Sequence, residues 1–164
     1  MAINSHEFLE FVIQPALAQL GETSTIAKRL LLATACYETE IGSHLVNDKG
    51  LGIFAISESL HKEVWDKFIA LDCDLASRVR GMASQHEFPK QPHQELITNL
   101  LYSAAIAWMV YQYRMVELPQ EATAESLADC WQKYYVGGPI NREQRSDFIT
   151  CFNKIAPQSK PIAA

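Results

Sequence analysis

The sequence has few of the features that would let a protein bind nucleic acid or cross a membrane. Its 14 lysines and arginines are scattered among 19 acidic residues, so the net charge is −5 and no basic stripe can follow a phosphate backbone. The longest strongly apolar run, residues 96–116, is interrupted by Asn99, Ser103 and Gln112, whereas a membrane span needs about 20 predominantly apolar residues. We therefore expect no nucleic acid as partner and no membrane insertion.

Targeting and metal-binding patterns are also missing. The N-terminus, MAINSHEFLEF, has neither the basic region nor the apolar stretch of a secretory signal, so we expect synthesis in a reducing cytoplasm. No cysteine has CxxC or Cys/His metal spacing, and His44 and His61 lack a third ligand at a sensible spacing. We expect no metal and no cofactor. Cys36, Cys130 and Cys151 lie in apolar helical patterns, which favours reduced core cysteines over disulfides.

Strand patterns are too few for a sheet-based core, whereas apolar residues recur with the helical period almost throughout. Ser5 can cap a first helix, and Thr23, Ser24 or Thr25 can cap a second that runs to Gly42. Apolar residues lie on nearly every side of this second helix, which indicates that it is the buried central one.

Residues 43–56 break the helical pattern. Asn47-Asp48-Lys49-Gly50 is turn chemistry and LGIFAI is a short β-prone run, so a small hairpin or loop is expected before a helix capped by Ser57. The whole pattern predicts one all-α domain, residues 1–156, with about seven helices around the central one. A polar tail, residues 157–164, follows.

Two carboxylates stand out at the end of the central helix. Glu38 and Glu40 follow a helix whose other residues are nearly all apolar, so desolvation should raise their pKa, and the negative pole of the helix acts in the same direction. A carboxylic acid with a raised pKa is what a glycosidase needs to protonate a leaving oxygen. The alternative is that the core ends here and both acids are solvated.

Three blocks in order resemble the lysozyme-like superfamily, in particular its soluble lytic transglycosylase and goose-type branch, closest to small phage-encoded members. The blocks are ETEIG at 38–42, GIFAISE at 52–58 and YYVGGP at 134–139, and the NLLYSAA stretch from Asn99 resembles the opening of the family's long central helix. The resemblance implies a lysozyme-like fold over residues 35–150. It also selects Glu38 over Glu40, because Glu38 precedes a small hydroxyl residue.

The resemblance implies roles for further residues. Tyr135 would lie beside Glu38, where its hydroxyl can position the acid. The glycan-binding candidates are the loop residues and one residue of the long helix: Gly52, Phe54, Ile56, Ser57 and Tyr102. Phe54, Ile56 and Tyr102 also fit a competing interpretation as core residues.

The implied activity is cleavage of the peptidoglycan glycan strand between N-acetylmuramic acid and N-acetylglucosamine. Glu38 would act as general acid and then base in a lytic transglycosylase, whereas a muramidase needs a partner acid, for which Asp48 and Glu58 flank the expected cleft. No serine or cysteine shows a nucleophile motif, so covalent catalysis is set aside. Such an enzyme would reach the bacterial cell wall through membrane lesions or within a virion.

The sequence departs from the family pattern at several loop positions. Ala55 stands where the family has Gln, Glu58 where it has Pro and Val136 where it has Asn, and Ser57 replaces an acid found in small phage relatives. These losses leave open a lysozyme-like domain without turnover, serving as a virion structural part or as a glycan- or protein-binding module. A wholly unrelated helical interaction protein is a further alternative.

Overall fold

Helices form almost all of the ordered secondary structure in residues 2–156, the part of the chain that this computed structural model describes. Between those residues the only β contacts are isolated bridges, so the expected all-α class is confirmed. The predicted polar tail, residues 157–164, lies outside the described residues. The elements are α1 (Ser5–Phe8), the π-helix η1 (Leu9–Ile13), α2 (Gln14–Gln19), α3 (Thr25–Thr39), α4 (Glu58–Lys67), η2 (Ile69–Leu71), α5 (Cys73–Gly81), η3 (Pro92–Gln94), α6 (Glu95–Thr98), α7 (Leu100–Tyr113), α8 (Ala124–Cys130), the π-helix η4 (Trp131–Val136) and α9 (Arg142–Ile155).

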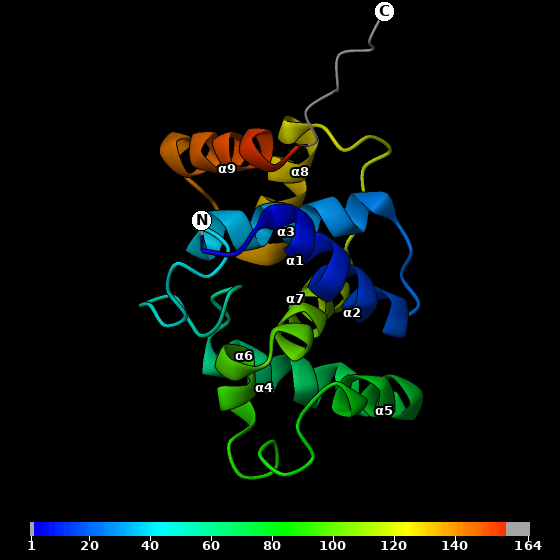
Figure 1. The fold of residues 1–164 in the computed structure, drawn as a ribbon. Helices are drawn as coiled ribbons and strands as arrows, with labels where there is room; N and C mark the ends of the chain where they lie inside the picture. Colours follow the sequence, from blue (N-terminus) through cyan, green and yellow to red (C-terminus); the bar gives the residue numbers. More distant parts are fainter. Residues whose placement is uncertain (1, 157–164) are drawn as a thin grey trace, which may run out of the picture.

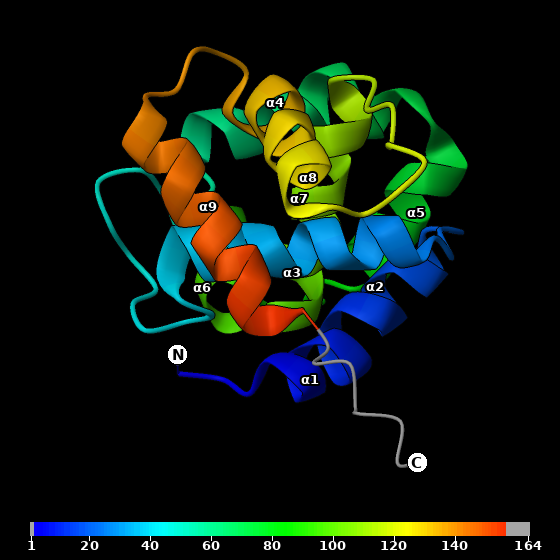
Figure 2. The same ribbon diagram turned by 90° about the horizontal axis from the view of Figure 1, so that it is seen from above.

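Two helices form the middle of the molecule. In Figure 1, α3 crosses the centre with α8 and α9 on one side and α4, α5 and α6 on the other, while α7 connects the two sides; Figure 2 shows α9 lying across α3. Every residue of α7 from Tyr102 to Tyr111 is buried, and α3 is buried over most of its length. The predicted central helix therefore shares its role with α7. No described helix has both the length and the apolarity that a membrane span requires.

Helix starts follow local capping chemistry. The side chain of Ser24 accepts hydrogen bonds from the first turn of α3, and that of Ser57 accepts one from the first turn of α4, as expected for these residue types. The expected cap at Ser5 is wrong by one position, because the side chain of Asn4 accepts the hydrogen bond from the first turn of α1.

The exit from α3 is a strained left-handed turn. The helix ends at Thr39 rather than at Gly42, and Glu40, Ile41 and Gly42 have φ values of 52°, 55° and 88°. A β-branched residue rarely adopts positive φ. Ile41 is held there because its side chain is fully buried and its N–H donates to the carbonyl oxygen of Ala35 at 3.1 Å. Packing thus maintains strain next to Glu38.

The segment after α3, residues 43–57, is a loop with isolated bridges from Leu51 to Val46 and to Ile56. Its tip is the predicted turn, in which the side chain of Asn47 accepts hydrogen bonds from the N–H groups of Lys49 and Gly50. The expectation of a small hairpin or loop is met by this arrangement.

Thr39 fixes the loop to the end of α3. Its hydroxyl donates to the carbonyl oxygen of Ile53 at 2.7 Å and accepts from the N–H of Gly42 at 3.1 Å, in a fully buried position. We expect Thr39→Val to lower the free energy of unfolding by about 2 kcal/mol, because it removes the hydrogen-bond partner of the buried carbonyl oxygen of Ile53 and of the partly buried N–H of Gly42. Urea denaturation would measure this. Thr150→Val, an exposed helical position, is the matched control and should change stability by less than about 0.5 kcal/mol.

Candidate active site

Glu38 opens onto a small cavity between α3, the 43–57 loop, η4 and α9. Its side chain is only 7 % exposed, whereas Glu40 is exposed. The Glu38 cavity has a volume of about 260 Å³ and is lined by Tyr37, Glu38, Lys49, Ala55, Ser57, Leu60, Trp131, Tyr135, Val136 and Gln144. Three of the residues singled out in the sequence, Glu38, Ser57 and Tyr135, therefore lie around one cavity.

The surroundings of Glu38 favour its protonated form. Burial raises the pKa of this carboxyl above its ordinary value, while the ammonium group of Lys49 and the nearby indole of Trp131 oppose part of that rise. The Nζ of Lys49 lies 3.6 Å from Oε2 of Glu38 and 4.9 Å from the centre of the Tyr37 ring. The balance is a buried acid with a raised pKa, held beside one solvent-accessible cation.

Tyr135 borders the Glu38 cavity, but its hydroxyl is bonded elsewhere. It donates a 2.6 Å hydrogen bond to the carbonyl oxygen of Phe54. Burial, and after it the negative charge of Glu38, raise the pKa of Tyr135 well above its ordinary value, so the phenol stays protonated. Since its single proton is directed to Phe54, Tyr135 fixes the loop that forms the cavity wall instead of donating to Glu38.

Four of the predicted glycan-binding residues are core residues. Phe54, Ile56 and Tyr102 are each at most 1 % exposed, and Gly52 is buried with its Cα facing the carbonyl oxygen of Leu96. The hydroxyl of Tyr102 is bonded to His61 and Trp65, not to an open groove. The prediction that these residues line a sugar groove is therefore corrected. The 43–57 loop turns Phe54 and Ile56 inward and Tyr102 is buried on α7, so the competing interpretation of these three as core residues is the one that the structure supports.

Ala55 and Ser57 form the side of the 43–57 loop that faces the Glu38 cavity. Phe54 and Ile56, on either side of Ala55, are buried. Ala55 has a φ of 50°, so a backbone bend, not regular strand alternation, sets which side chains point outward. The hydroxyl of Ser57 caps α4 by accepting from the N–H of Leu60 at 3.2 Å.

Several residues of the cavity were not found from the sequence. Lys49 belongs to the predicted turn, and its approach to Glu38 depends on how the loop folds back. Gln144 comes from the first turn of α9, where its side chain accepts from the N–H of Asn141. Trp131 lines the cavity and also stacks on Phe148, with ring centres 4.8 Å apart. No local pattern distinguishes such residues from ordinary surface and core positions.

Among the described residues, Glu38 is the one carboxylic acid that lines the Glu38 cavity. Neither Asp48 nor Glu58 lines it, and both are exposed. Among the described residues, no group of three His, Cys, Asp or Glu side chains is arranged to hold a metal ion. Glu38 is therefore the group at this cavity that is best suited to proton transfer.

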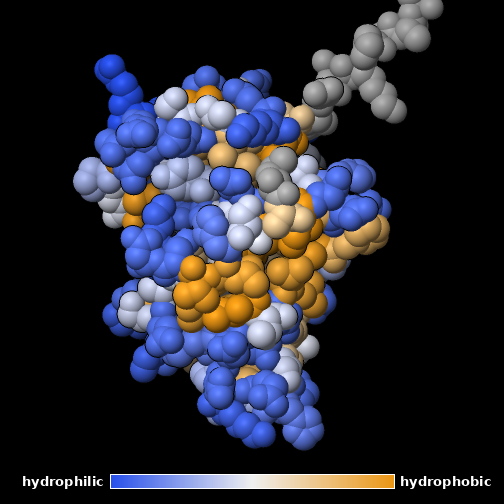
Figure 3. All heavy atoms as spheres, turned by 60° about the vertical axis from the view of Figure 1, so that its left-hand side comes forward, coloured by the Kyte–Doolittle hydropathy of each residue, from blue (hydrophilic) through white to orange (hydrophobic). Residues whose placement is uncertain are grey.

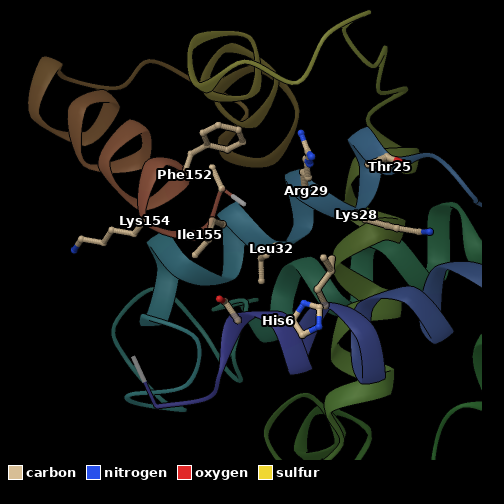
Figure 4. Close-up of a pocket in the computed structure, with 11 residues that line it drawn as sticks. His6, Thr25, Lys28, Arg29, Leu32, Phe152, Lys154 and Ile155 are labelled. Atoms are coloured by element: carbon tan, nitrogen blue, oxygen red, sulfur yellow. The ribbon is translucent and has the colours of Figure 1, made fainter. Parts of the chain in front are cut away.

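A larger cavity of about 440 Å³ lies between α1, α3 and α9. Leu32, Phe152 and Ile155 form its apolar floor, and no carboxylate is among its lining residues. Figure 4 shows Lys28, Arg29 and Lys154 around it, with their charged ends pointing in different directions. The surface in Figure 3 also carries an apolar area within a mostly hydrophilic face. His6 lines the larger cavity but is exposed, whereas Glu38 is nearly buried, so Glu38 remains the strongest candidate for acid–base chemistry.

Comparison with known proteins finds nothing similar: no protein-family model, no curated protein and no solved structure matches the chain. The fold and the site together define an all-α protein with one nearly buried carboxylic acid at a small cavity.

The raised pKa of Glu38 predicts a stability difference that depends on pH. Near pH 7 the folded protein bears the cost of a desolvated carboxylate, so Glu38→Gln should raise the free energy of unfolding there. The gain should grow as the pH rises above 4.5, the ordinary carboxyl pKa, and vanish below it, where Glu38 is protonated in both folded and unfolded states. Urea denaturation of the variant and wild type at several pH values measures this difference in the free energy of unfolding. The prediction would be contradicted if the gain from Glu38→Gln were smaller at pH 7 than at pH 4.

Proposed function

We propose that this protein cleaves the glycan strand of peptidoglycan between N-acetylmuramic acid and N-acetylglucosamine, with Glu38 as general acid and base. The observation that carries the proposal is the state of Glu38: a carboxyl 7 % exposed, with a pKa raised by burial, at the edge of a cavity. The resemblance of the ETEIG, GIFAISE and YYVGGP blocks to the lysozyme-like superfamily supports the same assignment.

The proposed reaction needs only this acid. Protonated Glu38 gives its proton to the glycosidic oxygen as the bond from that oxygen to the muramyl C1 breaks. The Glu38 carboxylate then takes the proton of the muramyl 6-hydroxyl, whose oxygen bonds to C1 and closes an anhydro ring. No water is consumed. Since no second carboxylate lines the cavity among the described residues, a lytic transglycosylase fits the site better than a muramidase with two acids.

The products distinguish the reactions. Purified protein would be incubated with intact sacculi, and the released muropeptides identified by mass spectrometry. Anhydro-muramyl ends are expected. Reducing ends would replace the transglycosylase by a muramidase, and the absence of any released fragment would contradict glycan cleavage. The place of action that goes with this proposal is the bacterial cell wall, reached from the cytoplasm or from a virion.

A second candidate is a lysozyme-like domain that binds glycan or virion proteins without turnover. The observation that favours it is the contact between Lys49 and Glu38, because a cation 3.6 Å from the carboxylate favours the form that has no proton to donate. Ala55 and Val136 line the cavity without hydrogen-bonding side chains. Sedimentation of the protein with sacculi, without release of soluble fragments, is the result that this candidate predicts.

A further inference from the structure

Two cysteines that are distant in the sequence lie against each other between α3 and α9. Cys36 and Cys151 are 115 residues apart, and the Sγ of Cys36 lies 3.9 Å from the carbonyl oxygen of Cys151. Cys36 and Cys151 also line the same cavity. Both cysteines are free. The fold has therefore brought two cysteines side by side across the interface of two helices.

The two thiols differ in access to solvent. Cys36 is 2 % exposed, whereas Cys151 is half-buried. Both line one cavity of about 490 Å³, which we call the thiol cavity; its other lining residues are Tyr37, Glu40, Lys49, Asp147, Thr150 and Lys154. A small molecule that enters from solvent through this cavity meets Cys151, and Cys36 lies behind it.

The two thiols also differ in acidity. Interaction with the neighbouring Cys36 side chain lowers the pKa of Cys151, and the positive charge of Lys154 acts in the same direction against the burial of that thiol. The same interaction, and after it burial, raise the pKa of Cys36. Because the thiolate is the nucleophile in disulfide exchange, the accessible sulfur is also the more reactive one.

We propose that Cys36 and Cys151 form a disulfide-exchange site at which a small disulfide oxidises the pair and links α3 to α9. The Cys151 thiolate attacks one sulfur of the small disulfide, its S–S bond breaks, and one small thiolate leaves. Cys36 then loses its proton to solvent and attacks the sulfur of Cys151, which releases the second small thiolate. Two electrons pass from the cysteines to the small disulfide, and the products are one protein disulfide and two small thiols.

The link would act on the neighbouring Glu38 cavity. Cys36 precedes Glu38 by two residues on α3, and Cys151 lies on α9, which supplies Gln144 to the cavity wall. Tyr37 and Lys49 line both cavities. A covalent bond between the helices would therefore fix two walls of the Glu38 cavity relative to each other. This inference does not depend on the proposed glycan cleavage.

Oxidised glutathione is the probe, applied to the folded full-length protein carrying Cys73→Ser, which removes an exposed thiol. We expect an intact mass lower by two hydrogens, a single cross-linked peptide containing Cys36 and Cys151, and a thermal midpoint higher by roughly 10 °C, because the bond closes a long loop. A stable glutathione adduct on Cys151, no reaction under native conditions, or a linked pair other than Cys36 and Cys151 would each overturn the proposal.

Single substitutions test the order of events. Cys36→Ala should stop at the glutathione adduct on Cys151, and Cys151→Ala should leave Cys36 unreacted because it is buried. Cys130→Ala, also at a buried position, should still form the Cys36–Cys151 bond. If a variant does not fold, the cross-linked peptide from the Cys73→Ser protein decides the question by itself.

Discussion

Replacing Glu38 by Gln is expected to lower the rate of muropeptide release from sacculi by about 1,000-fold, the size of a lost general acid. Gln has nearly the same shape and stays neutral, so the Glu38 cavity keeps its volume while losing its only carboxyl among the described residues. The substitution removes the proton donor without creating a buried charge. Since burial already disfavours the carboxylate, the variant should fold normally. The loss of rate can then be assigned to the missing proton donor and not to misfolding.

Glu40→Gln is the matched control for this experiment. Glu40 is exposed and does not line the Glu38 cavity, so its replacement should leave the rate within about twofold. Release would be followed by the soluble muropeptides formed over time, with far-ultraviolet circular dichroism confirming the helical fold of both variants. A full rate in Glu38→Gln together with a large loss in Glu40→Gln would show that the wrong acid has been assigned.

Gly52→Ala is expected to lower the free energy of unfolding by about 4 kcal/mol, through backbone strain and a steric clash together. Gly52 has a φ of 75°, and a Cβ built on it would lie 1.8 Å from the carbonyl oxygen of Leu96 and 3.2 Å from Oγ of Ser103. Backbone atoms of α6 cannot move aside as the end of a flexible side chain can. The 43–57 loop would have to lift away from α6.

The same substitution at Gly81 provides a control. Gly81 ends α5, and a Cβ there meets nothing within 4 Å, so Gly81→Ala should raise stability slightly, by about 0.5 kcal/mol. Urea denaturation of the two variants and wild type gives the comparison. A Gly52→Ala protein with a midpoint equal to that of wild type would contradict the close contact between the loop and α6.

Helix starts could be predicted from the sequence because the information is local. Ser24 and Ser57 bond to N–H groups two or three residues away, so the sequence around each residue is sufficient. The exit from α3 could not be predicted in the same way. Ile41 adopts a positive φ that its residue type disfavours, and burial among distant parts of the chain holds it there.

The candidate site also combines features that the sequence could predict with features that depend on the folded path of the chain. The apolar helix pointed to Glu38 and Glu40 alike, and the resemblance of the three blocks selected Glu38 and placed Tyr135 near it. Phe54 and Ile56 were placed on the wrong side because a bend at Ala55 decides which side chains face the core. The contact between Lys49 and Glu38 depends on the path of the whole 43–57 loop. A short sequence motif cannot predict that path.

The central claim is that Glu38 donates a proton to the glycan, and a carbon-13 NMR titration of its side-chain carboxyl, compared with the pH dependence of muropeptide release, tests it most directly. We expect a titration midpoint above the ordinary value of 4.5, and a rate that falls with rising pH at that same midpoint. A midpoint at or below 4.5, or a rate that stays constant while Glu38 ionises, would contradict it.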